Sequence, residues 1–386
     1  MKPDFTARYN YNFPTSVRFG KGVIDELGKH LADKGLKRPL IVTDPGLVKL
    51  EVFQKVLGSL KAAGLTPEVF SGIDKNPVKS NVLKGADFYV SHKSDSIVGF
   101  GGGASMDVAR AIALRINHTR DLFDYDDATG GDRFVTEEVP YFVTVPTTSG
   151  TGSEVGRSTV ISDDVTHEKK ILFSPKLLAS KVFADPELTM GLPPFITAAT
   201  GVDALTHNVE AYLAKGFSPL CDGIALEGIR LISQSLEKAT NNPDIESRSK
   251  MMMASLMGAT AFQKGLGVVH SLAHPLSTVV DMHHGLANAI MIPFGMEFNA
   301  EVAEERMRTM CEVVGLKERS PRSFITWLQE LNAKIGIPKN LSSQKVTKEH
   351  LVRLSELAEK DPCHPSNPRP VTRADFLKIY EKALNA

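Results

Sequence analysis

IVGFGGGASMDVARAI, residues 97–112, is the stretch of sequence that decides the fold. Its first four residues form a short apolar run that predicts a buried strand. The apolar positions Val108 and Ile112, four residues apart, predict a helix directly after the glycines. Glycines at such a junction let the backbone approach a ligand closely, and the helix N-terminus offers free N–H groups to a phosphate. Because the spacing differs from the GxGxxG dinucleotide fingerprint, the segment predicts either a pyrophosphate site or an ordinary tight turn.

The rest of the first half repeats this alternation of strand and helix. Further apolar runs that predict buried strands occupy residues 40–43, 68–70 and 142–145. Residues 49–63 carry helical periodicity and end before Gly64, a helix stop signal. Strands separated by helices indicate βαβ units, and therefore a Rossmann-like, mostly parallel sheet covered on both faces.

The second half has a different character, and the change comes near residues 191–194. No convincing strand follows, and helical periodicity recurs in eight segments: 197–214, 218–238, 246–264, 286–298, 300–314, 321–335, 347–359 and 372–384. A chain of 386 residues has the length of two large domains. We therefore expect an α/β dinucleotide-binding domain over residues 1–190, followed by an all-α domain over residues 191–386.

Composition excludes several classes of protein. Lys plus Arg and Asp plus Glu both number 45, so the basic excess of a nucleic-acid binder is missing. No apolar run approaches the roughly 18 residues of a membrane span, and the polar N-terminus does not resemble a signal peptide. The three cysteines are far apart and contain no CxxC pair, which argues against a disulfide framework and a thiolate zinc site. These features predict a cytoplasmic globular protein with no nucleic-acid or membrane partner.

Two other segments just past predicted strands are candidate ligand contacts. Asp44 follows an early strand, where a carboxylate can accept hydrogen bonds from ribose hydroxyls, although an Asp before Pro45-Gly46 is also an ordinary turn residue. The small hydroxyl residues and glycines of residues 146–154 can line a cofactor groove, or can form a plain polar loop.

Acidic and imidazole side chains recur at helical spacing in the second half. Asp203 and His207 are four residues apart within a helical stretch, so both project from one face. His270 and His274 are again four apart, and residues 283–284 add two more histidines. One carboxylate with several imidazoles suits a divalent metal such as Fe(II) or Zn(II), whereas the alternative is a set of hydrogen-bonded core histidines.

This combination resembles the iron-containing (group III) alcohol dehydrogenases. Within that family, the sequence is similar to the lactaldehyde/propanediol reductase branch. The resemblance extends from residues 19–22 to residues 367–369. It is most specific in the segments GGGASMD (101–107), PTTSGT (146–151), GVDALTH (201–207) and residues 270–285. It implies a metal-dependent enzyme that transfers hydride between a primary alcohol, or the corresponding aldehyde, and NAD.

The resemblance also implies the site residues. The metal, Fe(II) or alternatively Zn(II), would be held by Asp203, His207, His270 and His284, and His274 is a proton-handling residue beside it. The fourteen-residue step from His270 selects His284 over His283. The dinucleotide contacts and the residues of the phosphate loop fall on ten positions: Asp44, Gly101, Gly102, Gly103, Ser105, Asp107, Thr147, Thr148, Val160 and Lys169.

The substrate has a second interpretation. Arg157 stands where many relatives have smaller or neutral residues, and three further basic residues are Lys170, His364 and Arg369. If two of these side chains converge on the substrate, they favour a polar or carboxylated molecule, such as the terminal hydroxyl of the sugar acid 3-deoxy-octulosonate. A dehydroquinate-synthase-like lyase is a remote alternative, and so is a metal-binding protein without catalytic activity.

The assembly prediction comes from the N-terminus. Residues 9–19 alternate in polarity and are typical of an edge strand that can pair with a second copy, although an ordinary internal strand fits as well. Relatives are commonly dimers or multiples of dimers, so we expect a homodimer.

Overall fold

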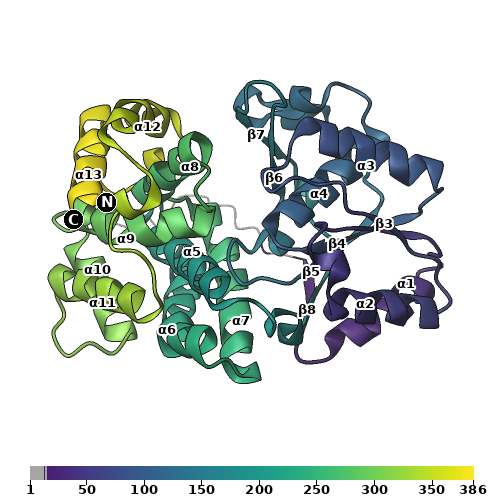
Figure 1. Cartoon of the computed structure of the whole chain (residues 1–386), viewed down its shortest axis with the longest axis horizontal. Helices are drawn as coiled ribbons and strands as arrows, with labels where there is room; N and C mark the ends of the chain where they lie inside the picture. Colours follow the sequence, from purple (N-terminus) through teal and green to yellow (C-terminus); the bar gives the residue numbers. More distant parts are fainter. Residues whose placement is uncertain (1–12, 14) are drawn as a thin grey trace. The chain divides into compact units, whose positions relative to one another are not determined.

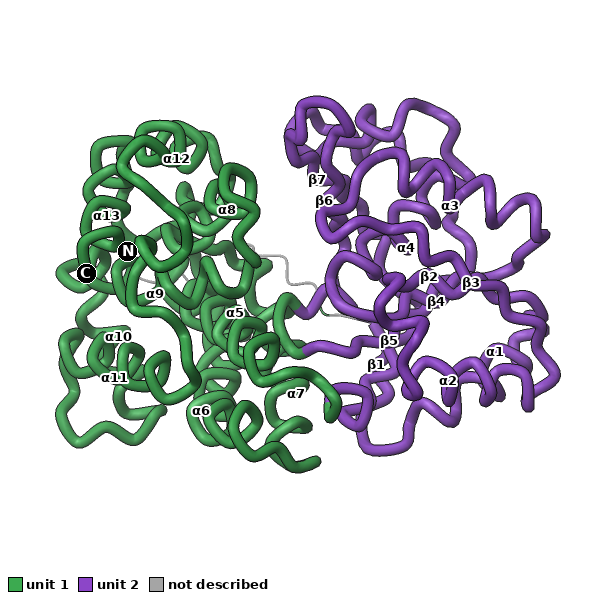
Figure 2. Tube along the Cα trace, viewed as in Figure 1, with its two compact units in different colours: residues 1–13, 149–151, 190–386 green, residues 14–148, 152–189 purple. Residues whose placement is uncertain are grey.

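The computed structural model describes residue 13 and residues 15–386, and it divides into two compact units (Figure 2). The α/β unit contains residues 15–148 and 152–189, and the helical unit contains residue 13, residues 149–151 and residues 190–386. The chain passes from the first unit to the second between Thr189 and Met190. The short segment Ser149–Thr151 belongs with the helical unit, although the sequence on either side of it is α/β.

A six-stranded parallel sheet forms the centre of the α/β unit, with strand order β1-β8-β5-β4-β2-β3. Figure 1 labels β3, β4, β5 and β8 of this sheet. Its strands are β1 (Ser16–Phe19), β2 (Pro39–Val42), β3 (Glu68–Phe70), β4 (Ser96–Gly101), β5 (Tyr141–Pro146) and β8 (Lys181–Ala184). The register pairs Val42 with Gly99 and Gly101 with Pro146, so the ends of β2, β4 and β5 meet at one edge. The predicted parallel α/β sheet is confirmed.

Helices cover both faces of this sheet. The helices are α1 (Leu27–Asp33), α2 (Glu51–Ala62), α3 (Lys79–Ser91) and α4 (Gly103–Asn117). One apolar cluster joins α1 and α2 to Ile41 and Val98, and the other joins α3 and α4 to their strand neighbours Leu40 and Ile97. Successive strand residues point to opposite faces, so α2 and α3 lie on opposite sides of the sheet. Successive strands are therefore added on one side of β2 as far as β3, and on its other side from β4 onward. The position between β2 and β4 is the topological switch point, where open α/β sheets bind ligands.

A small antiparallel pair, β6 (Ser158–Ser162) and β7 (Lys169–Phe173), lies outside this sheet. The sequence analysis did not predict the pair, because polar and apolar residues mix in Ser158–Ser162 and Lys169–Phe173, and neither segment is apolar throughout. Thr159 Oγ1 donates to the backbone carbonyl of Asp107 at 2.7 Å, so β6 is fixed to α4.

Helices make up the second unit, and all the predicted helical segments are present (Figure 1). They are α5 (Pro194–Leu213), α6 (Pro219–Asn241), α7 (Ile245–Ala261), α8 (Val268–Val280), α9 (His284–Asn299), α10 (Glu304–Val313), α11 (Pro321–Lys334), α12 (Lys348–Lys360) and α13 (Arg373–Asn385). Helix α8 was not predicted as a helix, because Pro275 interrupts its pattern. Within the described residues, no helix is long and apolar enough to cross a membrane.

Helix α5 is the buried centre of this unit, and glycines on its neighbours allow the close approach. A Cβ atom at Gly228 on α6 would meet Asn208 Oδ1 of α5 at 2.0 Å, and one at Gly258 on α7 would meet Asn208 Nδ2 at 2.7 Å. The Asn208 amide donates to the Ala254 carbonyl at 3.0 Å, which links α5 to α7. This packing fixes the position of α5, the helix that carries Asp203 and His207.

Candidate metal centre and dinucleotide loops

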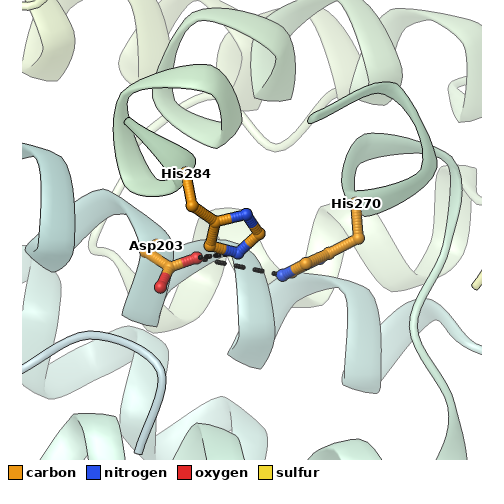
Figure 3. A group of neighbouring side chains, drawn as sticks. All are labelled: Asp203, His270 and His284. Carbon is orange, nitrogen blue, oxygen red and sulfur yellow. Dashed lines mark ion pairs between the residues drawn. The ribbon is translucent and has the colours of Figure 1, made fainter. Parts of the chain in front are cut away.

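Three helices bring the four predicted metal ligands together. Asp203 and His207 lie one turn apart on α5, His270 is in the first turn of α8, and His284 begins α9. Figure 3 shows the carboxylate of Asp203 directed toward the rings of His270 and His284. One ligand atom from each of these three residues lies within 4.8 Å of the other two.

The distances within the cluster are those of groups that face a common point. Asp203 Oδ1 lies 3.4 Å from His284 Nε2 and 3.8 Å from His270 Nε2. His207 lies outside the three-residue group, but its Nε2 is 3.1 Å from His270 Nε2. Two imidazole nitrogens at that distance cannot both carry hydrogen, so at least one lone pair faces the other ring.

Burial sets the charge of these groups. Asp203, His207 and His270 are almost completely buried, and the His284 side chain is 30% exposed. Burial lowers the pKa of His207, and it lowers the pKa of His270 further because the ring also lies near His207. Burial alone would raise the pKa of Asp203, but His207 and His284 bring it far below its usual range. A carboxylate grouped with imidazole nitrogens is the donor set of a divalent-metal site.

Two polar residues that the sequence analysis missed contact the same carboxylate. Asn288 Nδ2 donates to Asp203 Oδ1 at 2.8 Å and lies 3.1 Å from His284 Nε2. Thr151 Oγ1 donates to the other oxygen, Oδ2, at 3.4 Å. Asn288 is four residues after His284 on α9, a spacing that could have identified it.

His274 is held by a carboxylate from a distant loop. Its Nδ1 lies 2.6 Å from Asp361 Oδ2, and Asp361 Oδ1 accepts hydrogen bonds from Ser271 Oγ at 2.7 Å and from the Cys363 backbone N–H at 2.9 Å. Burial would raise the pKa of Asp361, but His274 lowers it well below its usual range. The His274 ring stacks on His284 with centroids 5.2 Å apart. His274 is therefore oriented beside the predicted ligands.

Cys363 lies close enough to His274 and Asp361 to form a second group of metal-ligand types. Burial, together with the nearby carboxylates of Asp361 and Glu210, raises the pKa of the Cys363 thiol well above its usual value. A metal ligand must be a thiolate, so this group is better described as a hydrogen-bonded network.

The predicted dinucleotide residues gather at the switch point of the sheet. Asp44 follows β2, Gly101–Gly103 join β4 to α4, and Thr147 and Thr148 follow β5. The backbone of Gly101 has φ +143°, and a Cβ atom there would lie 2.5 Å from Ser105 Oγ, so a glycine is required. The Thr147 N–H donates to the Gly101 carbonyl at 2.9 Å, which joins the two loops. Asp44 Oδ1 accepts from the N–H groups of Gly46 and Leu47, both at 2.9 Å.

Four other predicted contacts lie on α4 and on the β6–β7 pair. Ser105 and the Asp107 side chain belong to the first turns of α4, where the Asp107 carboxylate accepts from Ser153 Oγ at 2.9 Å and from the Val160 N–H at 3.2 Å. Lys169 is half-buried at the start of β7. Asp107 and Val160 thus contact each other, and the Asp107 carboxylate already has hydrogen-bond partners within the α/β unit.

The four basic residues considered for an anionic substrate each have a partner of their own. Arg157 lies over the ring of Phe173 at 5.6 Å, and Lys170 pairs with Glu168 at 3.2 Å and with Asp126 at 3.6 Å. His364 Nε2 is 2.9 Å from the Glu359 carbonyl, and Arg369 donates to the Phe298 carbonyl at 3.0 Å.

Comparisons with known proteins point to one class of enzyme, the oxidoreductases that act on alcohols. The chain is 36% identical to 4-hydroxybutyrate dehydrogenase of Cupriavidus necator over 96% of its length and 98% of that protein. It is 34% identical to NAD-dependent methanol dehydrogenase of Bacillus methanolicus over 97% and 100% of the two chains. The crystal structure of a 1,3-propanediol oxidoreductase superposes with a TM-score of 0.93 and 34% identity, covering 98% of this chain and all of the other.

The family itself is shown by sequence profiles that match both halves. The profile described as iron-containing alcohol dehydrogenase matches residues 14–186. The profile described as the C-terminal part of the Fe-containing alcohol dehydrogenase family matches residues 197–384. The chain belongs to the iron-containing alcohol dehydrogenase family. The resemblance seen in the sequence is confirmed.

Proposed function

We propose that this protein is a metal-dependent, NAD-linked alcohol dehydrogenase or aldehyde reductase that acts on a small primary alcohol or the corresponding aldehyde. The observation that carries the proposal is the convergence of Asp203, His270 and His284, with ligand atoms within 4.8 Å of one another. The names of the relatives, which include a methanol dehydrogenase and a propanediol oxidoreductase, support a primary alcohol.

The donor set fits a divalent first-row metal. The Nε2 atoms of His207 and His270 face each other at 3.1 Å in a buried position, and the Asp203 carboxylate carries the compensating charge. Three imidazoles and one carboxylate leave a dication with a net positive charge. Asp203, His207, His270 and His284 would hold Fe(II), with Zn(II) as the alternative.

The dinucleotide would bind at the edge of the sheet in the α/β unit. The first turn of α4 offers backbone N–H groups that suit a pyrophosphate, and Asp44 follows the neighbouring strand β2, where its carboxylate suits a ribose 2′-hydroxyl. A carboxylate there repels the 2′-phosphate of NADP, so the proposed dinucleotide is NAD. The relative named NAD-dependent methanol dehydrogenase supports this choice.

The chemistry divides between the bound groups and the protein. When bound, the metal would supply Lewis-acid polarisation of the substrate oxygen, and the nicotinamide would supply the hydride exchange. Asp361 holds the ring of His274 through Nδ1, which leaves Nε2 for proton exchange. The His274 side chain is 32% exposed, so a proton taken up there can reach water.

A substrate panel tests the proposal. The purified enzyme, loaded with Fe(II), is assayed for NADH absorbance with methanol, butanol, 1,3-propanediol and their aldehydes. We expect NADH formation with at least one primary alcohol, and NADH consumption with the matching aldehyde. No net change in NADH with any member of the panel would contradict the proposal and would favour the lyase alternative.

A second substrate class is an alcohol that also carries a carboxylate. The relative at 36% identity is named 4-hydroxybutyrate dehydrogenase, and Arg157 is the basic residue that the sequence singled out. The comparison is kcat/KM for 4-hydroxybutyrate and a sugar acid against butanol, in the wild type and in Arg157→Ala. A wild-type preference for butanol that the substitution leaves unchanged would exclude the carboxylated substrate.

A further inference from the structure

Glu210 is a completely buried carboxylate next to the proposed metal ligands. It lies on α5, three residues after His207, and its side chain is 1% exposed. Glu210 Oε2 is 2.6 Å from His270 Nδ1, the ring nitrogen that does not face His207. Within the described residues, no lysine or arginine forms an ion pair with this carboxylate, so His270 is its side-chain partner.

The N-terminus of α8 holds the same carboxylate in place. Gly267 precedes α8 and has no side chain to cap it, so the first N–H groups of the helix need partners from elsewhere. Glu210 Oε1 accepts from the Val269 N–H at 2.6 Å, and Oε2 accepts from the His270 N–H at 3.3 Å. A Cβ atom at Gly267 would lie 2.8 Å from Glu210 Oε1, so the missing side chain makes room for the carboxylate.

These contacts decide which nitrogen of His270 is available. A neutral imidazole carries one hydrogen, and a carboxylate can only accept it. With Glu210 at Nδ1, the hydrogen belongs on Nδ1, and the lone pair on Nε2 faces His207 Nε2 at 3.1 Å. Metal-binding histidines commonly donate their second N–H to a carboxylate, which fixes the ring and raises its basicity as a ligand.

We propose that Glu210 is a positioning residue that fixes His270 in the Nδ1–H form and so raises the metal affinity of the Asp203/His207/His270/His284 cluster. The inference rests on the proposed function, because it concerns the same metal. The N–H groups of Val269 and His270, at the positive end of α8, point at the two oxygens of this carboxylate and hold it beside the ring.

The test is Glu210→Gln, with the metal dissociation constant as the readout. Glutamine has nearly the same shape, but its amide can donate to His270 Nδ1, which would move the ring hydrogen to Nε2. The dissociation constants for Fe(II) and Zn(II) are measured by competition with a chelator. We expect binding about 10- to 100-fold weaker than in the wild type.

Glu154→Gln is the matched control. Glu154 is also buried, but it belongs to the α/β unit, whereas the cluster belongs to the helical unit. Each substitution removes one buried carboxyl group and keeps its shape, so the two variants differ in the groups that the carboxyl group contacts. Glu154→Gln should leave the metal dissociation constant unchanged.

Two measurements separate positioning from a general loss of structure. The thermal midpoint of the metal-free Glu210→Gln protein should match that of the wild type, since the α8 N–H groups keep an acceptor. Gly267→Ala, which retains the carboxylate but crowds it, should also weaken metal binding. Unchanged metal affinity in both variants overturns the inference while the proposed function stands. A wild type that binds no metal overturns both.

Discussion

Arg110→Met should destabilise the α/β unit by about 3–5 kcal/mol, the typical cost of leaving one partner of a buried ion pair alone. Arg110 is completely buried, two turns into α4, and its guanidinium donates to the Leu177 carbonyl at 3.2 Å and to the Ser158 carbonyl at 2.7 Å. It also pairs with the Asp107 carboxylate at 3.2 Å. Methionine keeps most of the apolar stem but leaves the carbonyls without donors and the carboxylate without its cation.

The assay must report on the α/β unit alone. The single tryptophan of the chain, Trp327, lies on α11 in the helical unit, so its fluorescence reports on the other unit. Amide hydrogen exchange of β4 and α4, measured by mass spectrometry, follows the α/β unit directly. A loss of 3–5 kcal/mol corresponds to protection that is about 100-fold lower or more, since 1.4 kcal/mol is a factor of ten.

Two further variants make this prediction refutable. Arg38→Met changes an exposed arginine of the same unit and should alter protection by about 0.5 kcal/mol or less. Replacing Asp107 by Asn together with Arg110→Met removes both charges and should recover part of the loss. If Arg110→Met costs less than about 1 kcal/mol, the buried pair does not stabilise the unit as argued.

Three other predictions concern pH, dinucleotide choice and assembly. Burial raises the pKa of Glu154 from 4.5 to about 7. Between these pH values the folded protein keeps a proton that the unfolded chain releases, so this residue lowers stability by about 3 kcal/mol as pH rises from about 4.5 to 7. Hydrogen exchange of the α/β unit at both pH values should show a smaller fall in Glu154→Gln, and an identical fall would contradict the prediction. Asp44→Gly should narrow or reverse the preference for NAD in kcat/KM, and a wild type that favours NADP would refute the role of Asp44. Light scattering at micromolar concentration should give twice the 42.0 kDa of one chain, whereas only a monomer would end the dimer prediction.

The predicted homodimer relies on an edge strand over residues 9–19, and the structure describes only part of this segment. Residues 9–12 and 14 lie outside the described residues. Ser16–Phe19 forms β1, which pairs with β8 at one edge of the sheet. Among the described residues β1 has no second neighbour, so pairing with another copy remains a prediction.

Periodicity and spacing predicted much of the fold because they are local properties. Alternating apolar runs and helical stretches located β2, β3, β4 and β5, as well as the helices that carry Asp203 and His284. Helix α8 escaped prediction because Pro275 breaks its pattern, while its N-terminus is capped by Glu210 and Asn367 from far along the chain. This capping depends on tertiary packing between distant segments, so the local sequence around α8 does not predict it.

The candidate site shows the same division between local and distant information. The spacing of Asp203 and His207 placed both on one helical face. The family resemblance selected His284 over His283, whose side chain instead accepts from the Leu286 N–H at 3.4 Å. The partners Glu210 and Asp361 lie 60 and 87 residues away from the histidines that they contact. Only the packing of α5, α8 and the loop after α12 brings them together, so sequence spacing could not identify them.

Metal removal and replacement, in the wild type and in His270→Ala, test the central claim most directly. The protein is stripped with a chelator, Fe(II) is added back, and bound metal and NADH formation with a primary alcohol are measured on the same samples. We predict that the stripped wild type is inactive, that about one metal per chain restores activity, and that His270→Ala regains neither, since losing one of four ligands weakens such a site severely. Full metal content and full activity in His270→Ala would contradict the account.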